Sequence, residues 1–128
     1  MSDHTTIDRE GVRAALDAGT TIVVEALPAP YYEDAHIPGA QNLPHDSDPT
    51  AIAAVLPDSD TTVVVYCSNL ACQNSTILSR RLVQLGYTDV REYEGGKEDW
   101  ITAGLPVASV EAVEAVEAVE AGTTVAGS

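Results

Sequence analysis

The chain has 128 residues, with 20 acidic residues against 6 basic ones and a formal net charge of −14. This length allows one compact domain with its own core, while two cysteines are too few for the disulfide framework of a small secreted protein. The shortage of basic residues argues against nucleic acid as a partner, because little would neutralise its phosphates. No apolar stretch approaches the roughly 18 residues of a membrane helix, and the first residues lack the basic and apolar regions of a signal peptide. We therefore expect no membrane contact and a cytoplasmic location.

The acidic composition also bears on the environment of the protein. Lys97 is the only lysine. Because repulsion among surface carboxylates is screened at high ionic strength, we interpret the composition as halophilic adaptation, typical of an acidic proteome in a salty cytoplasm. The alternative is an acidic patch for one basic partner. The sequence predicts no particular oligomeric state.

The first predicted element is a helix that Asp8 caps, that carries Val12 and Leu16 on one face, and that Gly19 closes. A strand follows at residues 20–25. Strands that alternate with short helices predict an α/β fold with a parallel central sheet. The remaining expected elements are a helical turn at 31–35, a short strand at 41–43, a helix at 49–56, a strand at 62–66, a helix from 75 that ends at Gly86, a strand at 90–93 and a helical turn at 97–103.

Cys67 is the candidate nucleophile, because it lies where an apolar strand stops and a short polar loop leads into a helix. The strand is apolar without alternation, as in a parallel strand covered on both faces. We expect Asn74 or Ser75 to cap the helix that follows. Open α/β sheets bind ligands at the carboxyl ends of their strands, and a nearby helix N-terminus can lower a thiol pKa from roughly 8.5 into the range of about 3.5 to 7.5. The alternative is a buried cysteine that only completes the core.

Three fragments around this cysteine resemble the rhodanese-like family, over about residues 6–107. The family pattern is a strand ending in Tyr-Cys, a loop, a helix closing on Gly-Tyr, and a strand leading to Gly-Gly-x-x-x-Trp. The fragments of this chain that carry the resemblance are His36-Ile37-Pro38-Gly39-Ala40, Tyr66-Cys67, Gly86-Tyr87, and Gly95-Gly96 with Trp100.

The resemblance implies a three-layer α/β domain with a parallel sheet of about five strands, and a loop whose backbone N–H groups point at the Cys67 sulfur. It also implies a sulfurtransferase in which Cys67 takes a sulfane sulfur from a small donor such as thiosulfate or a persulfide. The sulfur is held as a persulfide and passed to a thiol or protein acceptor, with no cofactor. The predicted active-site loop comprises Ser68, Asn69, Leu70, Ala71, Cys72, Gln73, Asn74 and Ser75.

The loop departs from the family pattern in length and charge. A common family loop reads C-x-x-G-x-R-S, whereas Ser75 stands eight positions after Cys67, two more than in that pattern. Asn74 replaces the arginine, and the loop has no basic residue. Anion binding would then depend on backbone N–H groups and polar side chains, which argues against phosphatase chemistry. Upstream, Glu25-Ala26 stands where the family usually has Asp-Arg, which puts the electrostatic support of the core in doubt.

Cys72 lies inside the same loop and is a candidate resolving thiol. It could attack a persulfide or sulfenic acid on Cys67 to form a disulfide. The alternative role is apolar packing beneath the loop. A second hypothesis for the whole chain follows from this pair: a non-catalytic rhodanese-like module that binds a partner or senses oxidants through Cys67 and Cys72.

No metal site is expected, because the three histidines and two cysteines lack the short spacings of metal ligands. We expect His36 to order the His-Ile-Pro-Gly-Ala turn instead.

The domain is expected at residues 1–107 and a flexible acidic tail at 108–128. The tail repeats Val-Glu-Ala with a period of three, so its valines wind around a helix without forming a fixed apolar stripe. A solvated tail is the preferred interpretation, and a partner-binding helix is the alternative.

Overall fold

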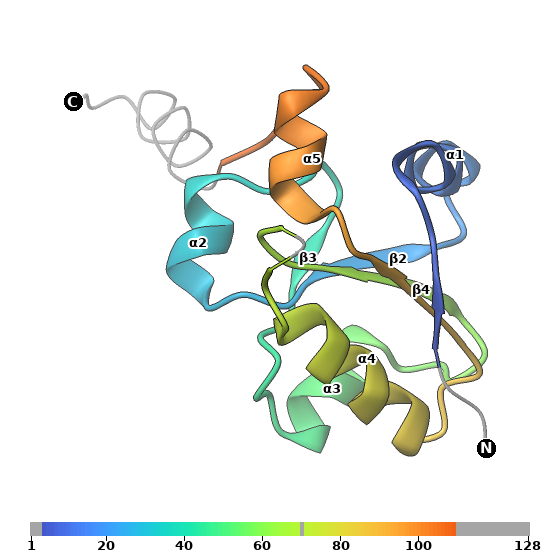
Figure 1. The fold of residues 1–128 in the computed structure, drawn as a ribbon. Helices are drawn as coiled ribbons and strands as arrows, with labels where there is room; N and C mark the ends of the chain where they lie inside the picture. Colours follow the sequence, from blue (N-terminus) through green and yellow to red (C-terminus); the bar gives the residue numbers. More distant parts are fainter. Residues whose placement is uncertain (1–3, 70, 110–128) are drawn as a thin grey trace, which may run out of the picture.

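The computed structural model describes residues 4–69 and 71–109. Within them, five parallel strands form one sheet in the order β1-β5-β4-β2-β3, which confirms the predicted fold class (Figure 1). The strands are β1 (Thr5–Thr6), β2 (Ile22–Glu25), β3 (Gln41–Asn42), β4 (Thr62–Tyr66) and β5 (Asp89–Tyr93). The helices are α1 (Arg9–Ala18), α2 (Ala29–Asp34), α3 (Pro49–Val55), α4 (Asn74–Gln84) and α5 (Gly96–Thr102).

Helices cover both faces of the sheet and make the three layers (Figure 1). Successive side chains of β4 point to opposite faces, so both faces of this central strand need an apolar cover. On one face, Val63 and Val65 pack in a buried cluster with Leu78 of α4 and Ile52 of α3. On the other, Val64 and Tyr66 join a cluster that includes Val12 of α1 and Trp100 of α5. Cys67, the next residue after β4, is thus held between two packed layers.

Local signals at the ends of α1 were sufficient to predict it. The carboxylate of Asp8 accepts a hydrogen bond from the backbone N–H of Gly11 at 2.8 Å, and Gly19 adopts the left-handed conformation with φ 76°. The first turn of α4 differs from expectation. Gln73 is at the N-cap with no side-chain capping bond, so the prediction that Asn74 or Ser75 caps this helix is wrong. Both lie inside the first turn, and Ser75 has a long-range partner instead.

Two further features lie outside the expected elements. Strand β1 was not predicted, because two threonines alone carry no apolar pattern; it pairs with β5 at the sheet edge. Near the expected end of the domain, His36 and Ala108 exchange two backbone hydrogen bonds of 2.9 and 2.8 Å. Residues 110–128, which hold almost all of the expected tail, lie outside the described residues, and the domain boundary stays a prediction. In the described part, no helix has the length and apolarity to cross a bilayer.

Candidate active site

The Cys67 sulfur lies at the carboxyl end of β4, beneath the first turn of α4. Cys67 is 2% exposed. Its sulfur donates a hydrogen bond to the Ser75 hydroxyl at 3.3 Å and approaches the carbonyl oxygen of Cys72 at 3.5 Å. The loop therefore folds back over the sulfur, so that residues five and eight positions further along the chain contact it.

The start of the loop is fixed by the N-terminus of α5. The backbone N–H groups of Lys97 and Glu98 donate to the carbonyl oxygens of Cys67 and Ser68 at 2.8 and 2.7 Å. This close approach requires a glycine at position 96. Gly96 has φ 67°, and a Cβ atom there would lie 2.6 Å from the carbonyl oxygen of Cys67. The Gly-Gly pair thus positions the backbone of the candidate nucleophile.

The loop N–H groups are divided between several acceptors, whereas the family resemblance implies a loop whose N–H groups point at the Cys67 sulfur. Asn69 takes two of them: its side-chain oxygen accepts from Ala71 at 3.0 Å and its carbonyl oxygen from Cys72 at 3.1 Å. The backbone N–H of Ser75 lowers the pKa of Cys67, and the backbone N–H groups of Ser68 and Asn74 lower the pKa of Cys72. Gln73 is exposed, and Leu70 lies outside the described residues.

Behind the cysteine, a buried carboxylate organises the first turn of α4. Glu92 of β5 is 2% exposed. One of its oxygens accepts from the hydroxyls of Ser75 and Thr76, each at 2.7 Å, and the other lies 2.8 Å from Nε2 of His4. Glu92 is not among the site residues predicted from the sequence. Strand alternation could have indicated it, because Glu92 is a charged residue on the same face of β5 as the core residue Val90.

The two thiols have opposite pKa shifts. Burial raises the pKa of Cys67, and contact with the Cys72 thiol raises it further, whereas its contacts with the hydroxyl and the backbone N–H of Ser75 lower it. Burial acts in the same direction on Cys72, but hydrogen bonds from Cys67, Ser68 and Asn74 outweigh it, so the pKa of Cys72 is lowered. The expectation of a lowered Cys67 pKa is therefore wrong: the sulfur is too deeply desolvated for one N–H group and one hydroxyl to offset.

The comparisons with known proteins agree with this geometry. The Rhodanese-like domain model matches residues 8–103. The chain belongs to the rhodanese-like family. It is 32% identical to the thiosulfate sulfurtransferase GlpE of Pseudomonas fluorescens over 102 residues, 80% of this chain and 89% of that one. It is also 30% identical to an HTH-type transcriptional regulator of Mycobacterium tuberculosis over 106 residues, 83% of this chain but 46% of the regulator.

A solved structure shows the same fold. A rhodanese from E. coli, determined with anions, superposes with a TM-score of 0.58 at 29% identity, over 70% of this chain and 98% of that one. The chain spans about half the length of the regulator it matches, so the relatives establish the domain family and leave the activity of the whole protein to be tested.

This rhodanese-like domain replaces the expected Asp-Arg support with an ion pair between distant residues. Glu25 is fully buried, and its carboxylate bonds the ammonium of Lys97 at 3.0 Å and the hydroxyl of Tyr66 at 2.7 Å. Lys97 also donates to the carbonyl oxygens of Tyr31 and Ala35 at 3.0 and 2.6 Å. The electrostatic support that the sequence left in doubt comes from Lys97, which lies 72 positions from Glu25 in the chain. The Lys97 ammonium, which lies beside the predicted active-site loop, is therefore bonded to three oxygen atoms.

His36 contacts the backbone and the ring of Tyr32, which agrees with the structural role expected from the sequence. Its Nδ1 lies 2.8 Å from the carbonyl oxygen of Tyr32, and the two rings stack at 3.8 Å. Among residues 4–69 and 71–109, no three His, Cys, Asp or Glu side chains are grouped to hold a metal ion.

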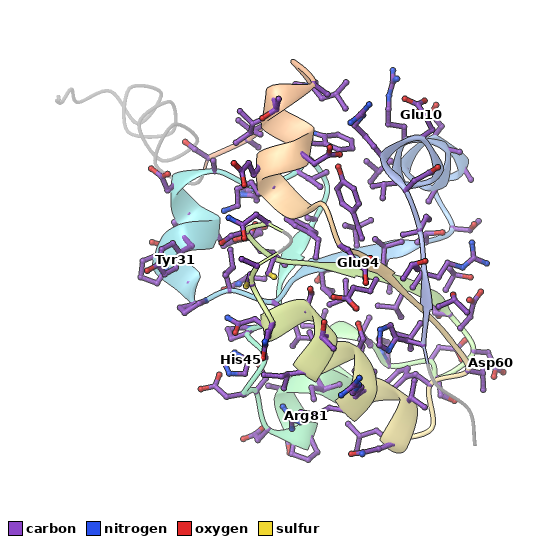
Figure 2. All side chains as sticks on the ribbon, viewed as in Figure 1. Glu10, Tyr31, His45, Asp60, Arg81 and Glu94 are labelled. Atoms are coloured by element: carbon purple, nitrogen blue, oxygen red, sulfur yellow. The ribbon has the colours of Figure 1, made fainter. Side chains whose placement is uncertain are left out.

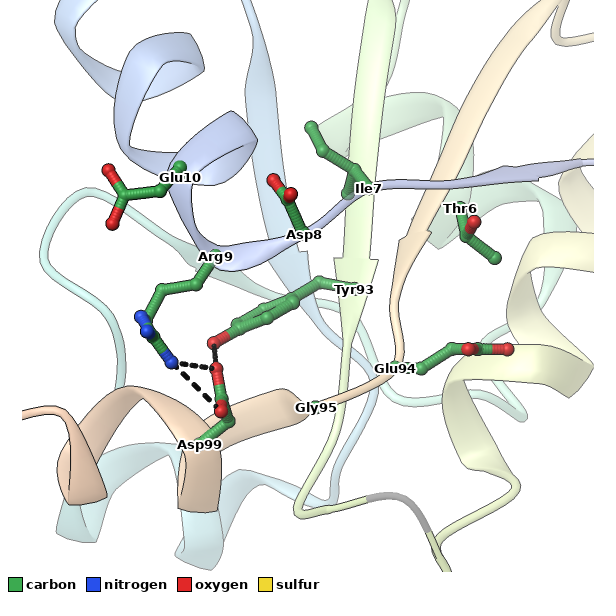
Figure 3. A pocket seen from close by; sticks show the side chains of 9 residues that line it. All are labelled: Thr6, Ile7, Asp8, Arg9, Glu10, Tyr93, Glu94, Gly95 and Asp99. Carbon is green, nitrogen blue, oxygen red and sulfur yellow. Dashed lines mark hydrogen bonds and ion pairs between the residues drawn. The ribbon is translucent and has the colours of Figure 1, made fainter.

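Two hollows border the loop of this rhodanese-like domain. One, of about 400 Å³, is lined by Ser68, Asn69 and Lys97 and by the exposed side chains of Tyr31 and Ile101; Tyr31 projects outward from α2 (Figure 2). The second, of about 470 Å³, is lined by Asn69 and Ala71 of the loop and by Glu98 of α5. A further hollow, of about 590 Å³, lies between α1 and α5. There the Asp99 carboxylate accepts hydrogen bonds from the guanidinium of Arg9 and the hydroxyl of Tyr93 (Figure 3). The first two hollows border the predicted active-site loop.

Proposed function

We propose that this chain is a sulfurtransferase in which Cys67 takes a sulfane sulfur and carries it as a persulfide. The observation that carries the proposal is the position of the Cys67 sulfur: at the carboxyl end of the central strand, under the first turn of α4, with its hydrogen bond to Ser75. The name of the matched relative, a thiosulfate sulfurtransferase, supports the same chemistry.

The reaction has two displacement steps. The Cys67 thiolate attacks the outer sulfur of thiosulfate, the sulfur–sulfur bond of the donor breaks, and sulfite leaves with the electron pair. An acceptor thiolate then attacks the outer sulfur of the persulfide and releases the Cys67 thiolate. Covalent catalysis of this kind splits one transfer into two easier steps.

The hollow beside Ser68 and Asn69 is the proposed entry for donor and acceptor. Among the described residues that line it, Lys97 is the one cation and already bonds three oxygen atoms, so a dianionic donor would be held by N–H groups and polar side chains. Tyr31 and Ile101 give the rim an apolar character that suits the carbon skeleton of an organic persulfide or thiol. We therefore expect organic persulfides to be better donors than thiosulfate.

The first prediction is a sulfur adduct on Cys67. The full chain is incubated in high salt with thiosulfate or an organic persulfide and its intact mass is measured, together with the variants Cys67→Ser and Cys72→Ser. We expect a mass increment of one sulfur in the wild type and in Cys72→Ser, and none in Cys67→Ser. The absence of this increment with every sulfane donor would contradict the proposed function.

The contact between the two thiols favours a second candidate, a redox-sensing module. Cys72 is more exposed than Cys67 and has the lower pKa, so a peroxide would oxidise Cys72 first to a sulfenic acid. Attack by Cys67 would then form a disulfide and release water. This reverses the order expected from the sequence, in which Cys72 resolves an oxidised Cys67. An intramolecular disulfide after mild peroxide, without sulfur loading by any donor, would favour this candidate over the sulfurtransferase.

A further inference from the structure

The hydrogen bonds behind Cys67 form a path from its sulfur to a buried carboxylate. The thiol donates to the Ser75 oxygen at 3.3 Å, and that hydroxyl donates to an oxygen of Glu92 at 2.7 Å. We infer that Glu92 is the proton acceptor for Cys67, reached through the Ser75 hydroxyl. The inference rests on the proposed role of Cys67 as the nucleophile and adds how this buried thiol becomes a thiolate.

The need for such an acceptor comes from the surroundings of the sulfur. Cys67 is 2% exposed, so water has little access to its proton, and burial disfavours the thiolate. The loop has no basic side chain to offset this cost. An internal proton acceptor at hydrogen-bond distance removes the need for bulk water, as in nucleophiles activated by an adjacent base.

Glu92 is placed to accept a proton, because its carboxylate ends the hydrogen-bond path that starts at the Cys67 sulfur. Its carboxylate is nearly enclosed, and its side-chain partners are the neutral hydroxyls of Ser75 and Thr76 together with His4. The titratable groups that face it are His4, from the segment before β1, and the two thiols of the loop, Cys67 and Cys72.

The transfer step is balanced within the protein. The S–H bond of Cys67 breaks as its proton moves to the Ser75 oxygen, and the proton of that hydroxyl moves to Glu92. One proton therefore passes from sulfur to carboxylate, and one negative charge passes from carboxylate to sulfur. After the acceptor has taken the sulfane sulfur, the proton returns by the same path and restores the Cys67 thiol.

A relay, a structural role and a simple charge effect make different predictions for Glu92→Gln. A glutamine can still accept the hydrogen bonds of Ser75 and Thr76 but cannot take a proton. If Glu92 acted only through its charge, removing that charge would favour the thiolate and speed its reactions at neutral pH. If it only supported α4, reactivity would fall equally at every pH. The relay alone predicts an upward shift of the pH profile.

The test is the alkylation rate of Cys67 by uncharged iodoacetamide between pH 5 and 10. It uses the full chain with Cys72→Ala, in which Cys67 is the only cysteine. We expect Glu92→Gln and Ser75→Ala each to move the inflection upward by about one pH unit or more and to slow alkylation at pH 7 about tenfold. Thr76→Val is the matched control. It removes a bond of the same length to the same oxygen of Glu92, off the path from Cys67, and we expect its rate to stay within about twofold of the parent.

Circular dichroism establishes that each variant is folded, and Glu92→Met, which also cannot take a proton, replaces Glu92→Gln if that variant is not. An unchanged or faster rate at pH 7, or a slower rate without a shifted inflection, would overturn the relay. Sulfur loading measured by mass separates this result from the proposed function. If the wild type loads sulfur but the variants have unshifted pH profiles, the proposed function stands and the relay is wrong. If the variants have shifted pH profiles but the wild type loads no sulfur, the relay stands and the proposed sulfurtransferase function is wrong.

Discussion

Glu25 is a carboxylate with no exposed surface, and it depends on one cation. Lys97, whose side chain is 13% exposed, bonds it at 3.0 Å and also holds two carbonyl oxygens of the α2 segment. Removing one partner of a buried pair leaves an uncompensated charge, which costs far more than the pair itself contributes.

We therefore predict that Lys97→Met lowers the free energy of unfolding by about 3–5 kcal/mol, measured by urea denaturation at neutral pH. Arg13→Met is the control, because it removes an exposed pair with Glu10 and should cost less than about 1 kcal/mol. The double variant Glu25→Gln with Lys97→Met should recover part of the loss, since no buried charge is then left unpaired. Equal costs for Lys97→Met and Arg13→Met would show that the buried pair contributes nothing special.

At the scale of elements, Asp99 joins α5 to α1 and β5 through Arg9 and Tyr93. The hydrogen bond from Tyr93, together with the hydrogen bond and charge of Arg9, holds the pKa of Asp99 below its usual range. A carboxyl group with a lowered pKa in the folded state stabilises the fold above the pKa of the unfolded chain, near 3.9, and loses this contribution as the pH falls through the folded value. The Asp99 side chain is 38% exposed, so solvent screens the effect.

We predict that Asp99→Asn is less stable than the wild type at pH 7 by up to about 1 kcal/mol, and that the difference shrinks as the pH falls below about 3.9. Urea denaturation at several pH values measures it. Glu10→Gln on α1 is the control, since it removes one carboxylate from an exposed pair, Glu10 with Arg13 at 3.4 Å, and should change the stability at pH 7 by less than about 0.5 kcal/mol. A gap between Asp99→Asn and the wild type that stays constant as the pH falls below about 3.9 would mean that geometry, not charge, carries the effect of Asp99.

Elements with local signals could be predicted, and contacts between distant residues could not. Asp8 and Gly19 identify α1 within a few residues of sequence, and the apolar run before Cys67 identifies β4 because both its faces are buried. Ser75 reads as a cap because its hydroxyl could bond a local N–H group. Its actual partner, Glu92, is 17 positions away, and only the pairing of β4 with β5 brings them together.

The same reasoning separates the parts of the candidate site. Tyr66-Cys67 and Gly95-Gly96 are recognisable because short motifs carry them, and Gly96 meets a requirement of its own backbone. The pair of Glu25 with Lys97 spans 72 residues and has no local signal. The cysteine pKa was mispredicted because the depth of burial depends on the packed layers, which local sequence does not report.

At the scale of the whole molecule, the net charge of −14 is a source of repulsion within the folded state. The acidic side chains are spread over the domain: Glu10 on α1, Asp60 before β4 and Glu94 after β5 lie on separate parts of the surface (Figure 2). This spread favours the halophilic interpretation over a single acidic patch for one basic partner. The Debye length falls from about 10 Å at 0.1 M salt to about 3 Å at 1 M, so salt should remove most of the repulsion between exposed carboxylates.

We predict that the melting temperature rises by roughly 5–10 °C between 0.1 and 1 M KCl, the shift expected if screening adds about 1–2 kcal/mol to the stability of a domain of this size. Screening should saturate near 1 M, because the Debye length is then already shorter than the spacing of most surface charges. Sucrose is the control, since it stabilises folded proteins by exclusion without screening, and its effect should grow steadily with concentration. A melting temperature that does not respond to KCl would contradict the halophilic interpretation and return attention to a basic partner for the acidic surface.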